Sequence, residues 1–190
     1  MNAITPPPAP PASPPSPYSS ALATSNTESH TLSVLVDNEP GVLARVVGLF
    51  SGRGYNIESL TVAEVAHAEH QSRITIVTSG TPEAVEQIRH QLERLVPVHR
   101  VTDLTVAGNF VERELAMVKV RGKGENRMEA LRLSEAFRGR VVDATTESFT
   151  FELTGAPSKI DHFVELMRPV GLVEVSRTGI AAISRGPEGM

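Results

Sequence analysis

The sequence predicts an α+β protein built from two consecutive units, each with the element order βαββαβ. Three observations lead to this prediction. Apolar and polar residues alternate in several short segments of each half of the chain, which is typical of strands with one buried face. Two segments of each half place apolar residues at spacings of three and four, which is typical of amphipathic helices. Gly, Pro and Asn separate these segments, as in turns.

The first unit begins with a strand over residues 31–37, whose apolar residues share one face: Leu32, Val34 and Val36. A turn with Asn, Pro and Gly follows, and it leads into a helix with the apolar stripe Val42, Val46, Leu49 and Phe50. Gly52 and Gly54 are expected to end this helix in left-handed conformations, which cost glycine little.

A hairpin is expected next, with strands over 55–65 and 71–80 and the sequence HAEH as its turn. Thr81 has the character of an N-cap, and Pro82 suits the first position of a second helix. The apolar face of that helix is Val85, Ile88, Leu92 and Leu95. A strand over 96–106 completes the unit, so we expect a ferredoxin-like antiparallel sheet with both helices on one face.

The second unit repeats this order without obvious sequence identity. Strands are expected over 114–122 and 171–179, and a hairpin over 139–155 in which Phe149, Phe151 and Leu153 form one buried face. One helix carries Ala130, Leu133 and Phe137 on one side, and the other carries Ile160, Phe163, Val164 and Met167. The sequence therefore predicts two ferredoxin-like domains, over 31–106 and 114–184. A linker over 107–113 is too short to let them move far apart.

The first 30 residues are rich in Pro, Ser and Ala, and carry too little apolar surface to offset the entropy of ordering. We expect this tail to be disordered or extended as polyproline II, and residues 185–190 to form a second tail. The runs PPAP and PPSP would also suit an aromatic groove, although a solubilising extension is the simpler interpretation.

Composition excludes several classes of function. The net charge of −4 argues against a surface dominated by phosphate contacts, so nucleic acid is not an expected partner. The chain has no Cys, which excludes disulfides and thiolate metal sites and fits a cytoplasmic protein. Its His residues show no metal-ligand spacing, and His67 and His70 are expected to be solvated turn residues. Because no apolar run reaches about 18 residues, we expect no membrane span.

The turn before the first helix is the clearest candidate binding site. A helix N-terminus offers unpaired N–H groups and partial positive charge, which attract a carboxylate. Gly41 would let a ligand approach the backbone, and Asn38 could accept from an ammonium group. The backbone N–H groups near Gly41, Val42 and Leu43 would meet the carboxylate of a free amino acid. Alternatively, Asn38 caps the helix or shapes the turn, and Gly41 serves backbone geometry.

Several motifs in order resemble one family. DNEPGVL at 37–43 and GLFSGRGYNIESL at 48–60 resemble the opening of an ACT domain. QSRITIV, VERELAMVKV, FRGRVVDATTESFTFELTG and RTGIAAISRG follow in the order found in the regulatory small subunits of acetolactate synthase, also called acetohydroxyacid synthase. The resemblance covers nearly everything from Thr31 to Gly186 and leaves out the Pro-rich tail.

This resemblance implies an effector site between two subunits. Asn38, Gly41, Val42 and Leu43 would come from one ACT domain, and Asn56 and Ile57 from the other. The effectors of the family are branched-chain amino acids, above all valine. The domains would pair edge to edge in a homodimer, which also covers an exposed strand edge. Asn56 as an ordinary turn residue after Gly54 is the alternative.

The resemblance also implies that the chain is not catalytic alone. The sequence contains no P-loop, GxSxG or GxGxxG motif. In the related enzyme a large catalytic subunit binds thiamine diphosphate, Mg²⁺ and FAD and condenses two molecules of pyruvate, or pyruvate with 2-oxobutyrate. This chain would bind none of these cofactors. It would dock on that subunit, raise its activity and confer feedback inhibition by valine.

Other functions remain open on the residues alone. A free-standing ACT-domain sensor of amino acids would not need the second domain. An acylphosphatase-like enzyme would need an Arg in the first loop, and residues 38–41 contain none. An RNA-binding fold would need exposed aromatic residues on its sheet, whereas Phe149 and Phe151 fit one buried face. Glu112, Arg113 and Glu114 form a charged cluster, for which a solvated surface is favoured over a subunit contact.

Overall fold

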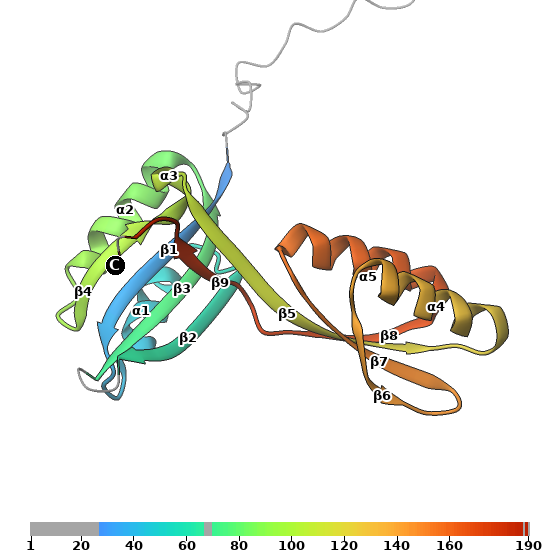
Figure 1. The fold of residues 1–190 in the computed structure, drawn as a ribbon. Helices are drawn as coiled ribbons and strands as arrows, with labels where there is room; N and C mark the ends of the chain where they lie inside the picture. The colour runs from blue at the N-terminus through green and yellow to red at the C-terminus, as the bar shows by residue number, and fades with distance from the viewer. Residues whose placement is uncertain (1–26, 67–69, 188, 190) are drawn as a thin grey trace, which may run out of the picture.

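The computed structural model describes residues 27–66, 70–187 and 189, and these form two α+β domains joined by a long strand (Figure 1). The two ferredoxin-like units expected from the sequence are confirmed, each with an antiparallel sheet. The Pro-rich tail up to residue 26, for which disorder or polyproline II was predicted, lies outside the described residues.

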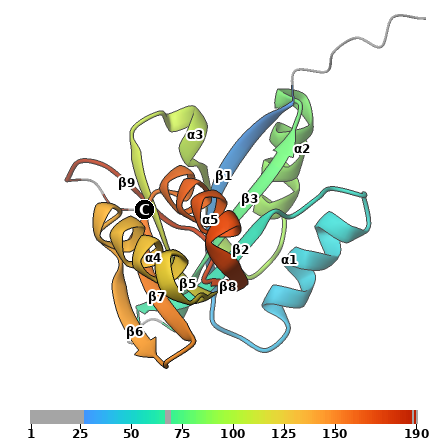
Figure 2. The ribbon, with the colours of Figure 1, turned by 90° about the vertical axis from the view of Figure 1, so that its right-hand side faces the viewer.

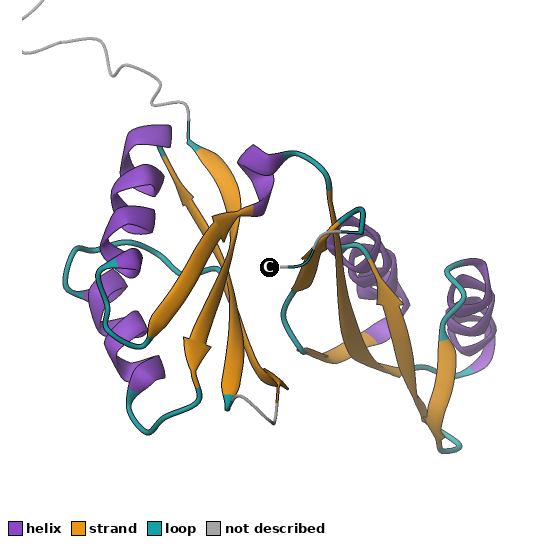
Figure 3. Ribbon diagram, turned by 60° about the vertical axis from the view of Figure 1, so that its left-hand side comes forward, coloured by secondary structure: helices purple, strands orange, loops and turns teal. Residues whose placement is uncertain are grey.

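The first domain has the order β1(Glu28–Asp37), α1(Val42–Ser51), β2(Ser59–Ala66), β3(Gln71–Gly80), α2(Pro82–Glu93) and β4(Val98–Asp103). Its sheet has the order β2-β3-β1-β4, with every pair antiparallel. Helices α1 and α2 cover the same face of the sheet (Figure 3). The apolar faces predicted for β1, α1 and α2 form the core: Leu32, Val34, Val36, Val42, Val46, Leu49, Phe50, Val85, Ile88 and Leu92. Leu95, predicted on the same face of α2, lies beyond the end of that helix and is partly buried.

Local capping explains where several elements begin and end. Thr81 Oγ1 accepts a hydrogen bond from Ala84 N at 3.3 Å, and Pro82 opens α2, as predicted. The strand predicted over 96–106 is too long, because Asp103 Oδ1 accepts from the N–H groups of Thr105 and Val106 and so begins a short helix, α3(Leu104–Ala107).

Strand β1 begins three residues before the predicted start at Thr31. His30 is buried, and its Nδ1 lies 2.7 Å from Oδ2 of Asp103 on the neighbouring strand. The β1–β3 ladder extends from Asp37, opposite Gln71, to Glu28, opposite Gly80. Residues 28–30, predicted as part of the tail, therefore belong to the first sheet.

The second domain contains β5(Phe110–Arg121), α4(Gly124–Ala136), β6(Arg140–Ala144), β7(Ser148–Gly155), α5(Pro157–Gly171), β8(Leu172–Arg177) and β9(Ala181–Ser184). Its main sheet has the order β6-β7-β5-β8, and α4 and α5 lie side by side over one face (Figure 2). The predicted face of β7 is buried with the α5 residues that cover it: Phe149, Phe151, Leu153, Ile160, Phe163 and Met167.

Strand β5 connects the domains, because it pairs with different strands along its length. Phe110 to Arg113 pair with β9, and Glu114 to Arg121 pair with β7. The β5–β9 ribbon lies against the face of the first sheet that α1 and α2 leave open (Figures 1 and 3). On that face Ser33 and Thr75 are 1% and 4% exposed. Residues 110–113, predicted as linker, are thus strand, and β9 was not predicted.

The two glycines expected to end α1 differ. Gly54 has φ of +71°, as expected, but Gly52 has φ of −65° and remains right-handed. A Cβ at Gly52 would lie 3.1 Å from Gly48 O, which is a tight contact, and a left-handed turn is not the reason for glycine here.

Gly48 gives a stability prediction. It lies inside α1 without a positive φ, and apart from the backbone of its own helix a Cβ there would meet no described atom within 4 Å. Because alanine loses less backbone entropy in a helix, Gly48→Ala is expected to stabilise the protein by roughly 0.5–1 kcal/mol. Urea unfolding of both proteins measures this. An unchanged or lower midpoint would show that position 48 meets a constraint absent from the single chain.

Candidate functional site

The turn between β1 and α1 is held by backbone hydrogen bonds and leaves Gly41 open. Asn38 N donates to His70 O at 2.6 Å, and Asp37 N donates to Pro97 O at 2.8 Å. Gly41 has φ of +88°, and a Cβ there would meet no described atom within 4 Å. Asn38 and Gly41 are both exposed. The turn therefore presents a bare stretch of backbone to solvent, as the binding hypothesis requires.

The N-terminus of α1 has free donors. The first helical hydrogen bond runs from Arg45 N to Gly41 O at 3.1 Å, and Val42 N reaches Glu39 O at 3.4 Å. Within the described residues, the N–H groups of Leu43 and Ala44 have no acceptor, and no side chain caps the helix. The alternative in which Asn38 caps α1 is therefore wrong. These donors, with the positive end of the helix dipole, can bind a carboxylate.

Asn56 and Ile57 lie in the loop that leads into β2. Thr78 Oγ1 donates to Asn56 O at 2.6 Å, so the backbone is held while the Asn56 side chain remains exposed. Ile57 is half-buried and packs against the core of the first domain. The loop thus offers an amide and part of an apolar side chain at one end of the sheet.

The two groups of predicted site residues lie at opposite ends of the first sheet. Asn38 follows the β1 residue that pairs with Gln71, whereas Asn56 contacts Thr78 at the other end of β3. At about 3.3 Å per residue, these β3 positions are roughly 23 Å apart. One chain therefore does not bring Asn38 and Asn56 together.

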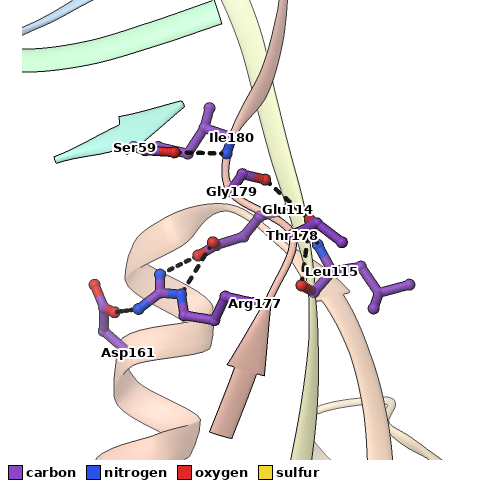
Figure 4. A network of polar contacts seen from close by, with 8 residues as sticks. All are labelled: Ser59, Glu114, Leu115, Asp161, Arg177, Thr178, Gly179 and Ile180. Carbon is purple, nitrogen blue, oxygen red and sulfur yellow. Dashed lines mark hydrogen bonds and ion pairs between the residues drawn. The ribbon is translucent and has the colours of Figure 1, made fainter. Parts of the chain in front are cut away.

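An ion-pair network around the buried Glu114 lies where the two domains meet (Figure 4). Arg177, at the end of β8, donates from Nε to Glu114 Oε2 at 3.0 Å and from Nη2 to Glu114 Oε1. Its Nη1 donates to Asp161 Oδ1 on α5 at 2.6 Å. The hydrogen bond to Glu114 raises the pKa of Arg177 above its usual value although burial opposes it. Glu114 is 4% exposed, so its prediction as solvated surface is wrong.

The segment after Arg177 contacts β2 directly. Ile180 N donates to Ser59 Oγ at 3.1 Å, and Thr178 N donates to Leu115 O at 3.0 Å. At Gly179, with φ of +83°, a Cβ would lie 2.8 Å from Thr61 Oγ1 and 2.9 Å from Ser59 Oγ. The close approach requires glycine. Ser59 follows Asn56 by three residues, so this contact joins the second domain to the predicted site.

Sequence reasoning missed Ser59, Arg177 and Gly179. The signal was the run RTG at the end of the last predicted strand, because a glycine that follows a charged residue at a strand end favours a close contact. Gly179 lies 120 residues after its contact Ser59 in the first domain, and no local pattern identifies Ser59 as that contact.

No group of three His, Cys, Asp or Glu residues could hold a metal ion in the part of the chain that the structure describes. His70 is exposed with φ of +50°, and His67 lies outside the described residues. None of the described helices is long and apolar enough to cross a membrane.

Comparison with family models assigns both domains. Residues 32–100 match the AHAS small subunit-like ACT domain, and residues 113–186 match the small subunit of acetolactate synthase. The open glycine turn and the βαββαβ order thus define the first unit as an ACT domain. The chain as a whole belongs to the family of acetolactate synthase small subunits.

Individual relatives agree over most of the chain. It is 42% identical over 167 residues to the acetolactate synthase small subunit of Mycolicibacterium smegmatis, which covers 88% of this chain and 97% of the relative. It is 48% identical over 156 residues to the isozyme 3 small subunit of Escherichia coli, which covers 82% and 94%. The crystal structure of the acetolactate synthase small subunit from Thermotoga maritima superposes with a TM-score of 0.76 at 40% identity, covering 85% and 99%.

Proposed function

We propose that this chain is the subunit that makes a thiamine diphosphate-dependent acetolactate synthase responsive to valine. It would bind the large catalytic subunit, raise its activity, and reduce that activity when valine occupies the ACT domains. The observation that carries this proposal is the open turn at Gly41, where free N–H groups, an exposed amide and an exposed Leu43 lie together.

The chemistry of this turn suits a zwitterion with a branched apolar side chain. The carboxylate of valine would accept from the N–H groups of Leu43 and Ala44, and Asn38 Oδ1 would accept from its ammonium group. The apolar side chain would lie against Leu43, which is 38% exposed, and against the half-buried Ile57 of a second copy. Valine would thus bind both its own subunit and the partner.

A dimer through β2 would bring the separated residues together. Strand β2 is at the edge of the first sheet, exposes Val62 and Val65, and has no partner on its outer side among the described residues. If two copies pair antiparallel along β2, the end of one strand near Asn38 meets the start of the other near Asn56. Two-fold symmetry then gives two equivalent sites, and the pairing covers both edges.

Regulation requires that valine bind two states of the complex with different affinity. A coupling free energy of ~1 to 3 kcal/mol is typical, and it would lower the activity of the catalytic subunit without any catalytic residue in this chain. The catalytic partner would hold thiamine diphosphate, Mg²⁺ and FAD. A cytoplasmic location follows from this role and is part of the proposal.

A free-standing ACT-domain sensor that controls some other enzyme is the alternative function. The match over residues 113–186 disfavours it, because a general sensor has no need of a second domain from the same family. Purification with a catalytic subunit, or without one, distinguishes the two.

Isothermal titration with valine, leucine and isoleucine tests the site, with mass measured by light scattering. Saturable valine binding to a dimer is expected. Asn38→Ala, Gly41→Asp and Asn56→His are each expected to weaken it by about 10- to 100-fold, because each removes or opposes hydrogen bonds to a charged ligand.

Arg100→Gln is the matched control, since Arg100 is exposed on β4, at the far edge of the sheet. This variant should bind valine like the parent protein. Unchanged affinity in all three site variants would refute the assignment of the site. Lost affinity with preserved activation of the catalytic subunit would support it.

A further inference from the structure

A cavity lies between the first sheet and the β5–β9 ribbon, away from the Gly41 turn. Its volume is about 340 Å³, at the small end of the range for ligand sites. Small and branched apolar residues form most of its wall: Ala63, Val65, Val111, Ala181, Ala182 and Ile183. The apolar wall comes from β2 on one side and from β5 and β9 on the other, so both domains build it.

Two arginines line this cavity from opposite walls. Arg73 lies on β3 opposite Ala63 of β2, and Arg113 lies on β5 opposite Ala181 of β9. Neither guanidinium has a carboxylate within ion-pair distance in the described parts of the chain. Arg113 donates to a backbone oxygen of Glu112. Two cations without counter-ions therefore face one small apolar space.

The charges indicate the class of ligand. A guanidinium recognises a carboxylate through paired hydrogen bonds, and the aliphatic wall suits a short branched hydrocarbon body. No Asp or Glu is among the described residues that line the cavity, so an ammonium group would lie beside two cations without compensation. An amino acid is therefore disfavoured, whereas the same carbon skeleton with a carbonyl oxygen in place of the ammonium is accommodated.

We propose that this cavity, with Arg73 and Arg113, is a separate binding site for a short branched monocarboxylate without an ammonium group. Arg73 and Arg113 bind the carboxylate. The site is distinct from the Gly41 turn, which binds through helix N–H groups and offers an acceptor for an ammonium. Two ligands with one carbon skeleton thus bind at two places according to the group on Cα.

Titration of the full chain with 3-methyl-2-oxobutanoate tests the proposal, with 3-methylbutanoate and valine as companion probes. Saturable heat is expected with 3-methyl-2-oxobutanoate and with 3-methylbutanoate, because both carry the carboxylate and the branched body without an ammonium group. Arg73→Gln is expected to weaken binding of the 2-oxo acid at least about tenfold, because half of the charged contact is removed.

Two further variants separate the site from general damage. Ala63→Leu fills the cavity without a change of charge and should also abolish binding, whereas Arg100→Gln, on the opposite edge strand, should not alter it. Thermal unfolding midpoints and the valine titration establish that each variant is folded. Asn38→Ala should leave the affinity for the 2-oxo acid unchanged.

Three results would overturn the proposal. The first is the absence of saturable heat with 3-methyl-2-oxobutanoate at millimolar concentration. The second is an affinity that neither Arg73→Gln nor Ala63→Leu changes. The third is a loss of binding in Asn38→Ala, which would mean that the 2-oxo acid enters the Gly41 turn. The valine site is tested separately, by valine titration of Asn38→Ala. A negative result with the 2-oxo acid therefore leaves the proposed function intact.

Discussion

Arg177→Met is expected to lower the free energy of unfolding by about 3–5 kcal/mol, the cost of leaving a buried charge without its partner. The Glu114 side chain is 2% exposed, and Arg177 is its ion-pair partner, whereas the Arg177 side chain is 36% exposed. Loss of the arginine leaves this nearly buried carboxylate without its cation. Glu114→Gln should cost less, because the arginine keeps Asp161 and partial contact with solvent. Urea unfolding followed by circular dichroism measures both.

Arg140→Met is the control for this comparison. Arg140 pairs with Glu152 at 2.7 Å, but its side chain is 72% exposed, and exposed ion pairs contribute only about 0–1 kcal/mol. If Arg140→Met destabilises the protein as much as Arg177→Met, burial of Glu114 is not the cause.

Gly171→Ala is expected to destabilise the second domain by about 2–5 kcal/mol, through backbone strain and overpacking together. Gly171 ends α5 with φ of +118°, and a Cβ there would collide with the backbone oxygen of Arg121 at the end of β5. A backbone atom within a sheet cannot turn aside as a side chain can. The collision therefore has to shift α5 or β5. The thermal unfolding midpoint and the near-ultraviolet circular dichroism measure the effect.

Gly124→Ala separates the two contributions to that cost. Gly124 begins α4 with φ of +57°, and a Cβ there would meet no described atom within 4 Å. This variant carries only the penalty for a left-handed residue, roughly 1–2 kcal/mol. Equal losses in Gly124→Ala and Gly171→Ala would mean that the contact with Arg121 contributes nothing.

The fold was predictable where local patterns determine it. Alternation placed Leu32, Val34 and Val36 on one buried face, and Thr81 with Pro82 marked the start of α2. Strand β9 was not predictable in this way, because four residues show no useful periodicity and their pairing partners near Phe110 lie 70 residues earlier.

The candidate sites show the same division. The open turn at Gly41 follows from local chemistry, since a glycine at a helix N-terminus exposes donors wherever it occurs. Glu114 was misjudged because a charged run usually lies in solvent, and its partner Arg177 is 63 residues away in the chain. Whether a charged residue is buried depends on tertiary contacts that the sequence around it does not contain.

The pairing of β5 with β9 affects the order in which the protein assembles during synthesis. All six elements of the ACT domain leave the ribosome before β9, which is the last element of the second domain to be made. At a synthesis rate of about 5–20 residues per second, the polar face of the first sheet remains without the β5–β9 ribbon for on the order of ten seconds. A nascent chain therefore exposes that face, with Ser33 and Thr75, to chaperones and to other nascent chains before it closes.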